Sequence, residues 1–160
     1  MIDFKEKRFD YKSICKEDEE MLELRSADIL KDLENEKTNF FYLGVHLIGF
    51  YNSGAYRVYA KGIMCEQMRI DYNLPIGAGN LCSEYFFAYC ENKFALEKSQ
   101  VSRLMNIADE FGNKARGFKA QWKDFKYSQL CELLPLTEEQ RKAVNPDWSI
   151  KKIREYKKTL

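Results

Sequence analysis

Apolar residues recur at helical spacing along most of the 160-residue chain, most clearly between residues 83 and 111. Four residues in the first part of this stretch share one apolar face: Phe86, Phe87, Cys90 and Phe94. Four in the second part do the same: Val101, Leu104, Met105 and Ala108. Ser83 can cap the free N–H groups of the first segment. The pattern predicts two helices, 83–94 and 98–110, joined by a tight turn at Ala95 and Leu96.

The second of these helices has an outward side that is polar and partly cationic. Its members are Lys98, Ser99, Gln100, Ser102, Arg103 and Asn106. Such groups can hydrogen-bond base edges and phosphates, so the pair is interpreted as a helix-turn-helix whose second helix enters the major groove of DNA. Ala95, Leu96, Val101 and Leu104 fit the small and apolar positions of such a unit. The alternative is two packed helices of an all-helical core with a solvated polar face.

The segments before this unit predict two further helices. Residues 17–36 are acidic, with one broad apolar stripe: Met21, Leu22, Leu24, Ala27, Ile29, Leu30 and Leu33. Ser26 and Asp28 could break this helix. Its acidic side is interpreted as a plain solvated face, the alternatives being pairing with the basic C-terminal part or mimicry of nucleic acid towards a partner. From a cap at Thr38 to Tyr51 the chain is apolar almost all round, which is typical of a central core helix. Gly44 and Gly49 are expected to allow the close approach of a neighbour, and Gly54 to cap the end.

The remaining segments complete an all-α prediction. Short helices are expected near 56–59 and over 65–72, followed by a connector at 76–80. Three more are predicted over 127–134, 138–144 and 150–160, with caps at Thr137 and Ser149. The fold class is a multi-helix domain containing a helix-turn-helix, with a short helical basic C-terminal extension. The expected divisions are 1–36 (arm and acidic helix), 37–117 (core with the helix-turn-helix) and 118–160 (extension).

Charge is unevenly distributed although the net charge is only +1. Residues 1–36 hold seven Lys or Arg against twelve Asp or Glu, whereas residues 93–126 hold eight against four. Further cations expected to attract phosphates are Lys93, Lys114, Arg116, Lys119 and Lys123. Phe118 and Trp122 either belong to a loop that lies along a phosphate backbone or simply pin this linker to the core.

The inventory of reactive groups argues against an enzyme, a metal site or a cofactor. The five cysteines are an odd number without C-x-x-C spacing, which indicates reduced thiols in a cytosol. The single histidine, His46, has no cysteine nearby with which to bind zinc. The paired acids Asp109-Glu110 are interpreted as exposed helix residues. No apolar run approaches the roughly 20 residues that span a bilayer, so no membrane association is expected.

Two stretches resemble known DNA-binding proteins. The segment LEKSQVSRLM resembles the recognition region of ParB/KorB-like partition proteins. The wider pattern from Tyr42-Leu43-Gly44 through Tyr85–Cys90 to Leu96–Phe111 resembles small phage and plasmid proteins of Gram-positive bacteria, as does the run YSQLCELLPLTEEQ with the last helix. The resemblance implies an all-helical DNA-binding module of a mobile element, acting in the cytoplasm of a bacterial host. Such proteins commonly form homodimers.

Two functions therefore remain open. The first is a non-catalytic protein that binds double-stranded DNA in transcription, replication or partition. The second is an anti-CRISPR inhibitor that binds a Cas nuclease such as Cas9, with or without DNA. The acidic helix and the aromatic-rich middle offer surfaces beyond those that DNA binding requires.

Overall fold

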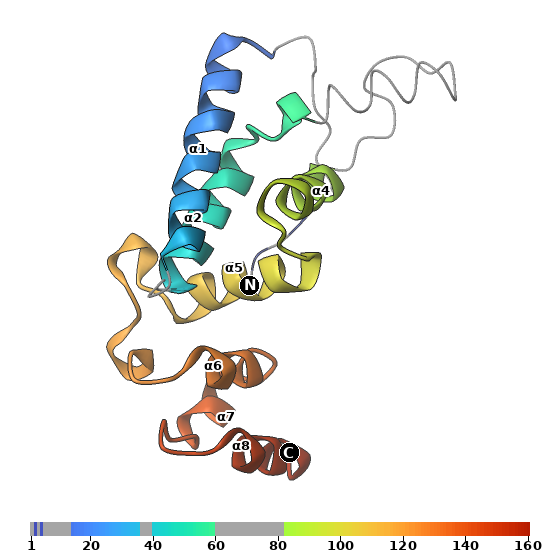
Figure 1. Ribbon diagram of the computed structural model, residues 1–160. Coiled ribbons are helices and arrows are strands. Elements are labelled where there is room, and N and C mark those ends of the chain that lie inside the picture. The colour runs from blue at the N-terminus through green and yellow to red at the C-terminus, as the bar shows by residue number, and fades with distance from the viewer. Residues whose placement is uncertain (1, 3, 5–13, 36–39, 60–81) are drawn as a thin grey trace, which may run out of the picture.

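The protein is all-helical in the residues that its computed structural model describes, which are 2, 4, 14–35, 40–59 and 82–160 (Figure 1). The only other pairing in these ranges is an isolated β-bridge between Gly112 and Phe118. The helices are α1 (Lys16–Glu34), α2 (Phe40–Ser53), α4 (Cys82–Phe94), α5 (Lys98–Phe111), α6 (Tyr127–Leu133), α7 (Glu138–Lys142) and α8 (Ile150–Lys158). The all-α prediction is confirmed.

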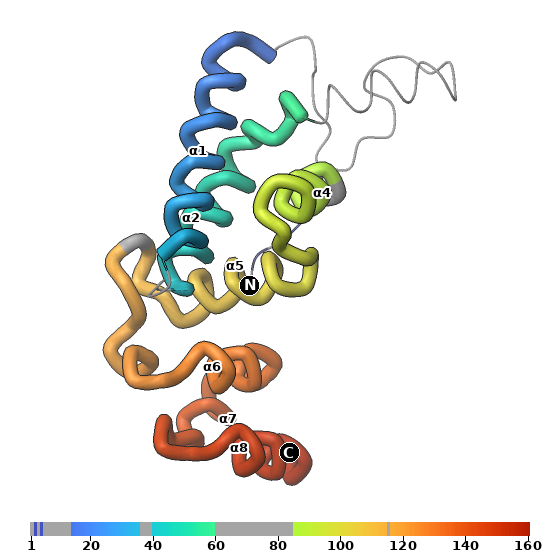
Figure 2. The backbone as a smooth tube through the Cα atoms, viewed as in Figure 1, coloured from blue at the N-terminus to red at the C-terminus, as the bar shows by residue number. Residues whose placement is uncertain are grey.

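Helix α5 lies between two groups of helices (Figures 1 and 2). On one side are α1, α2 and α4, and on the other are α6, α7 and α8. Each group has its own cluster of buried apolar side chains. Val101, Leu104 and Met105 belong to the first cluster, whereas Ile107 and Phe111 belong to the second. Helix α5 is therefore buried on two sides, which fixes its position in the molecule.

Helix α2 is the core helix that its composition predicts. It packs against both α1 and α5, and buries Phe41, Leu43, Gly44, Leu47, Phe50 and Tyr51. Gly54 follows its C-terminal end with a φ of 67°, the left-handed conformation expected of a glycine cap. The predicted cap Thr38, the helix over 65–72 and the connector at 76–80 lie outside the described residues.

Gly44 confirms the expected close approach of a neighbouring helix. A Cβ atom there would lie 2.3 Å from the carbonyl oxygen of Leu104 and 2.8 Å from the Cβ of Ala108. The backbones of α2 and α5 therefore touch at this point. Gly49, one and a half turns later, faces only the guanidinium end of Arg25, at 3.1 Å.

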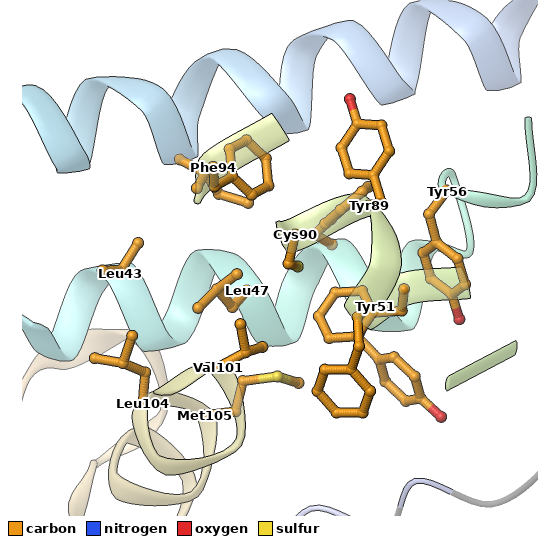
Figure 3. Packing of buried hydrophobic residues seen from close by; sticks show 14 of the residues in the cluster. Leu43, Leu47, Tyr51, Tyr56, Tyr89, Cys90, Phe94, Val101, Leu104 and Met105 are labelled. Carbon is orange, nitrogen blue, oxygen red and sulfur yellow. The ribbon is translucent and has the colours of Figure 1, made fainter. Parts of the chain in front are cut away.

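The first apolar cluster is dominated by aromatic rings (Figure 3). The fully buried Phe50 ring lies within 6 Å of the rings of Tyr56, Phe86 and Tyr89, mostly edge to face, as aromatic pairs prefer. The Tyr89 hydroxyl shares a 2.7 Å hydrogen bond with Ser26 Oγ, so its polar end is satisfied inside the core.

Helix α1 differs from the prediction in two ways. The predicted stripe is narrower than expected, because Ile29 is buried and Leu22 and Leu30 pack half-buried against the first cluster, whereas Met21 and Leu24 are exposed by 37% and 58%. The helix also continues through Ser26, whose hydroxyl donates to the carbonyl of Leu22. One alternative for its acidic side, pairing with the basic C-terminal part, does not occur, because α1 and α8 lie at opposite ends of the molecule (Figure 1).

The C-terminal group follows its predicted caps. Thr137 Oγ1 accepts from the N–H of Gln140, and Ser149 Oγ accepts from the N–H of Lys152. Helix α7 ends at Lys142 rather than at Val144, whose side chain is buried in the second cluster.

The linker between α5 and α6 forms two 3-10 turns, Lys114–Arg116 and Ala120–Trp122. The ring of Phe118 packs on those of Phe40 and Phe41, and Trp122 packs between Phe111 and Phe125. The aromatic residues therefore pin this linker to the core.

Arg141 fixes the C-terminal group to α5. Its buried guanidinium donates to the backbone carbonyls of Leu133 and Leu134 and to Glu110 Oε1 at 2.7 Å. It also lies 4.9 Å from the centre of the Phe111 ring. The interpretation of Glu110 as an exposed acid is wrong, because Glu110 is half-buried and paired; Asp109 is exposed as expected.

Candidate nucleic-acid interface

The turn between α4 and α5 is tight and contains one residue in the left-handed conformation. Ala95 adopts a φ of 54°, and its N–H donates to the carbonyl of Glu91 at 3.1 Å. This left-handed residue ends α4 and redirects the chain. Because alanine carries a Cβ, the conformation costs about 1 kcal/mol more than glycine would. The predicted turn at Ala95 and Leu96 is confirmed and also includes Glu97.

The start of α5 is fixed by Gln100. Its side-chain Oε1 accepts a 2.9 Å hydrogen bond from the N–H of Glu97, which satisfies a backbone group just before the helix. The amide oxygen of Gln100 is therefore used in capping, and its amide nitrogen is the part left for a ligand. Lys98 Nζ lies 5.1 Å from the centre of the Phe87 ring, a cation–π contact that holds this lysine beside α4.

The N-terminal half of α5 faces solvent. Four of the six predicted contact residues are exposed: Lys98, Ser99, Gln100 and Arg103. Ser102 and Asn106 are half-buried. The outward side of this half of the helix is therefore accessible to solvent.

Asn106 already has a partner within the chain. Its Oδ1 accepts a 2.8 Å hydrogen bond from the N–H of Ile2. Phe4 anchors the same segment, with its ring 5.0 Å from that of Phe87 and 5.2 Å from that of Tyr51. Ile2 therefore occupies one acceptor of Asn106 on this side of α5. The sequence could not predict this partner for Asn106, because Ile2 and Asn106 are 104 positions apart.

The remaining predicted cations are exposed but lie in two places. Lys93 is in the last turn of α4, close in sequence to Lys98. Lys114, Arg116, Lys119 and Lys123 follow the C-terminal end of α5. A 14-residue helix is about 20 Å long, so these four are separated by that length from the start of α5. Asp109 and Glu110 lie between the two groups, and Lys119 Nζ donates to the carbonyl oxygen of Glu110.

Arg103 lies at a cleft of about 430 Å³ that α5 forms with the C-terminal group. The other residues that line it are Tyr127, Ser128, Cys131, Glu132 and Arg154. Glu132 is paired on both oxygens, with Arg154 Nε at 2.7 Å and Lys157 Nζ at 2.8 Å. The bond from Lys157, with that from Arg154, lowers the pKa of Glu132. Burial raises the pKa of Tyr127 to about 12. The sequence did not predict this cleft, because Arg103 on α5 is 24 or more residues from the lining residues of the C-terminal group.

The other residues that the sequence singled out form no further candidate site among the described residues. His46 is paired with Asp32. In the described ranges, no three His, Cys, Asp or Glu side chains are grouped so that they could hold a metal ion. Within the same ranges, every helix is too short or too polar to cross a bilayer.

Comparison of the chain with protein-family models, curated protein sequences and solved structures finds no match.

Proposed function

We propose that this chain is a non-catalytic protein that binds double-stranded DNA with the N-terminal half of α5 in the major groove. The observation that supports this most is the combination of a tight left-handed turn at Ala95 with the exposed polar residues that follow it. Lys98, Ser99 and Arg103 reach solvent, and α4 holds the helix at a fixed angle. The process would be transcription, replication or partition of a phage or other mobile element.

In this proposal, some exposed residues of α5 contact base edges and others contact phosphates. Ser99 and Ser102 are short hydrogen-bonding groups suited to base edges, and the nitrogen of Gln100 adds a donor. Lys98 supplies attraction to phosphates that does not depend on sequence. The C-terminal half of the helix is enclosed by α2 and the C-terminal group, so the contacts are confined to its N-terminal half.

Binding to duplex DNA should be measured by fluorescence anisotropy over a series of salt concentrations. The proposal expects the logarithm of affinity to fall linearly with the logarithm of salt, by close to one unit of slope per phosphate contact. Lys98→Gln should lower both affinity and slope. Lys31→Gln removes the same charge from α1, on the far side of α2, and should change neither. Absence of binding to random and native-context duplexes at low salt would reject the proposal.

A second candidate is an inhibitor of a Cas nuclease such as Cas9, and the exposed acidic residues of α1 favour it. Glu17, Glu19, Glu20 and Glu23 are exposed, and α1 lies far from the basic α8. These carboxylates repel DNA but suit the positively charged channel in which such nucleases hold their duplex. Capture of the chain by guide-loaded Cas9 in the absence of DNA, and its loss in a Glu17→Lys/Glu20→Lys/Glu23→Lys variant, would support this candidate. Duplex binding without capture would support the first.

A further inference from the structure

We infer that the cleft between α5 and the C-terminal group is a clamp for one backbone phosphate of the bound duplex, formed by Arg103 and Arg154. The inference rests on the proposed DNA binding and deepens it. It assigns Arg103 to the phosphate backbone, whereas the sequence alone left it among the candidates for both base and phosphate contact.

The charges in the cleft favour an anion. Arg103 is exposed and makes no ion pair with the described residues. Arg154 is 65% exposed and is tied to Glu132 through Nε, so its two terminal nitrogens remain for a ligand. Lys157 takes the other oxygen of Glu132. The one carboxylate of the cleft is therefore neutralised from within, and the guanidinium of Arg103 is left uncompensated.

The uncharged groups in the cleft are also compatible with a phosphate ligand. Ser128 offers an exposed hydroxyl, which can donate to a phosphate oxygen, whereas the Tyr127 hydroxyl is hydrogen-bonded to the Cys131 side chain. Burial raises the pKa of Tyr127 and that of Cys131, so both stay neutral at physiological pH and add no negative charge. Guanidinium and hydroxyl donors around one small space match the several acceptor oxygens of a phosphate.

The position of the cleft identifies the phosphate as one on the duplex itself. Arg103 belongs to the exposed half of α5, only one turn from Ser99. A helix in the major groove has a sugar-phosphate strand along each side. The strand on the side of the C-terminal group would pass Arg103 and Arg154 together. Arg154 thereby extends the DNA contact to α8.

The test compares Arg103→Gln, Arg154→Gln and the double variant with Lys31→Gln as the control. Affinity is measured over a salt series for a random duplex and for a preferred duplex selected from a random pool. Each single variant should weaken binding to both duplexes by the same factor and lower the salt slope by about one phosphate contact. The double variant should lose little more slope than either single variant, because both arginines hold the same phosphate.

Two results would overturn the inference while DNA binding stands. One is an Arg103→Gln variant whose ratio of preferred to random affinity falls about tenfold or more, which would make Arg103 a base-reading residue. The other is an Arg154→Gln variant with unchanged slope. Thermal unfolding of each variant checks that it is folded.

A second measurement tests the cleft without DNA. Inorganic phosphate, titrated into the wild-type chain against chloride at equal ionic strength, should shift the Nε–Hε NMR signals of Arg103 and Arg154 together. Shifts without any duplex binding would retain an anion site and reject the proposed function. Duplex binding without either shift would reject the clamp.

Discussion

Replacing Gly44 by alanine tests the contact that positions α5 against α2. The new Cβ would lie 2.3 Å from the carbonyl oxygen of Leu104 and 2.8 Å from the Cβ of Ala108. A backbone oxygen cannot rotate away as the end of a side chain can. The two helices must therefore separate by several tenths of an ångström, and the packing of Leu47 and Val101 nearby must loosen (Figure 3).

The expected magnitude follows from two opposing terms. Overpacking a core costs about 1–3 kcal/mol, and contact with a fixed backbone atom favours the upper end of that range. Alanine in a helix gains about 1 kcal/mol over glycine. The net loss for Gly44→Ala is thus about 2 kcal/mol, and the melting temperature should fall by about 4–8 °C.

Gly49→Ala is the matched control, because it makes the same change in the same helix. Its Cβ would meet only the end of the Arg25 side chain, at 3.1 Å, which can move aside. Its stability should stay unchanged or rise by up to about 1 kcal/mol. Urea unfolding followed by far-UV circular dichroism measures both variants. If Gly44→Ala is as stable as Gly49→Ala, the inferred contact between the α2 and α5 backbones is wrong.

Three further predictions concern buried polar groups. Arg141→Met should lower the free energy of unfolding by about 2–4 kcal/mol in urea, because it removes the buried charged donor that Leu134 O and Glu110 accept from and that Leu133 O shares with the N–H of Leu136. The hydrogen bond from Arg141 lowers the pKa of Glu110 in the folded chain. The stabilisation of the folded chain by ionised Glu110 is therefore complete above the ordinary glutamate pKa of 4.5 and is lost as the pH falls through the folded-state pKa. Glu110→Gln should therefore make the free energy of unfolding fall less steeply in acid. Burial raises the pKa of Cys90 to about 12, so maleimide at pH 8 should label the exposed Cys15 in the native chain and Cys90 only after denaturation, as peptide mass spectrometry would show.

The helices α4 and α5 and the turn between them could be predicted from sequence because every signal for them is local. The apolar positions of α4 and α5 repeat every three or four residues, and the small Ala95 lies between them. The observed helices, Cys82–Phe94 and Lys98–Phe111, extend the predicted ranges by one residue each, and the predicted cap at Ser83 is wrong because α4 already includes that residue. The caps at Thr137 and Ser149 depend on neighbours three residues away, and both were predicted correctly.

The errors came from partners that are distant in sequence. The apolar residues of α1 span a wide arc of the helix, and periodicity alone could not tell that the core covers Leu22, Ile29 and Leu30 but leaves Met21 and Leu24 exposed. Arg141 is 31 residues from Glu110, so neither its burial nor its pairing could be read from the local pattern. Asn106 was assigned to DNA without knowledge of the hydrogen bond from Ile2.

The second apolar face of α5 has the most consequence for the proposed function. Ile107 and Phe111 are one turn apart and point to the C-terminal group, while Leu104 and Ala108 point to α2. The C-terminal half of α5 is therefore enclosed on two sides, and only its first two turns can enter a groove. In the proposed complex, the C-terminal group, which Arg141 fixes to α5, would lie beside the DNA strand that borders that groove. A surface next to a phosphate strand needs cations to offset the negative charge of the phosphates, and the exposed Arg154 would provide one.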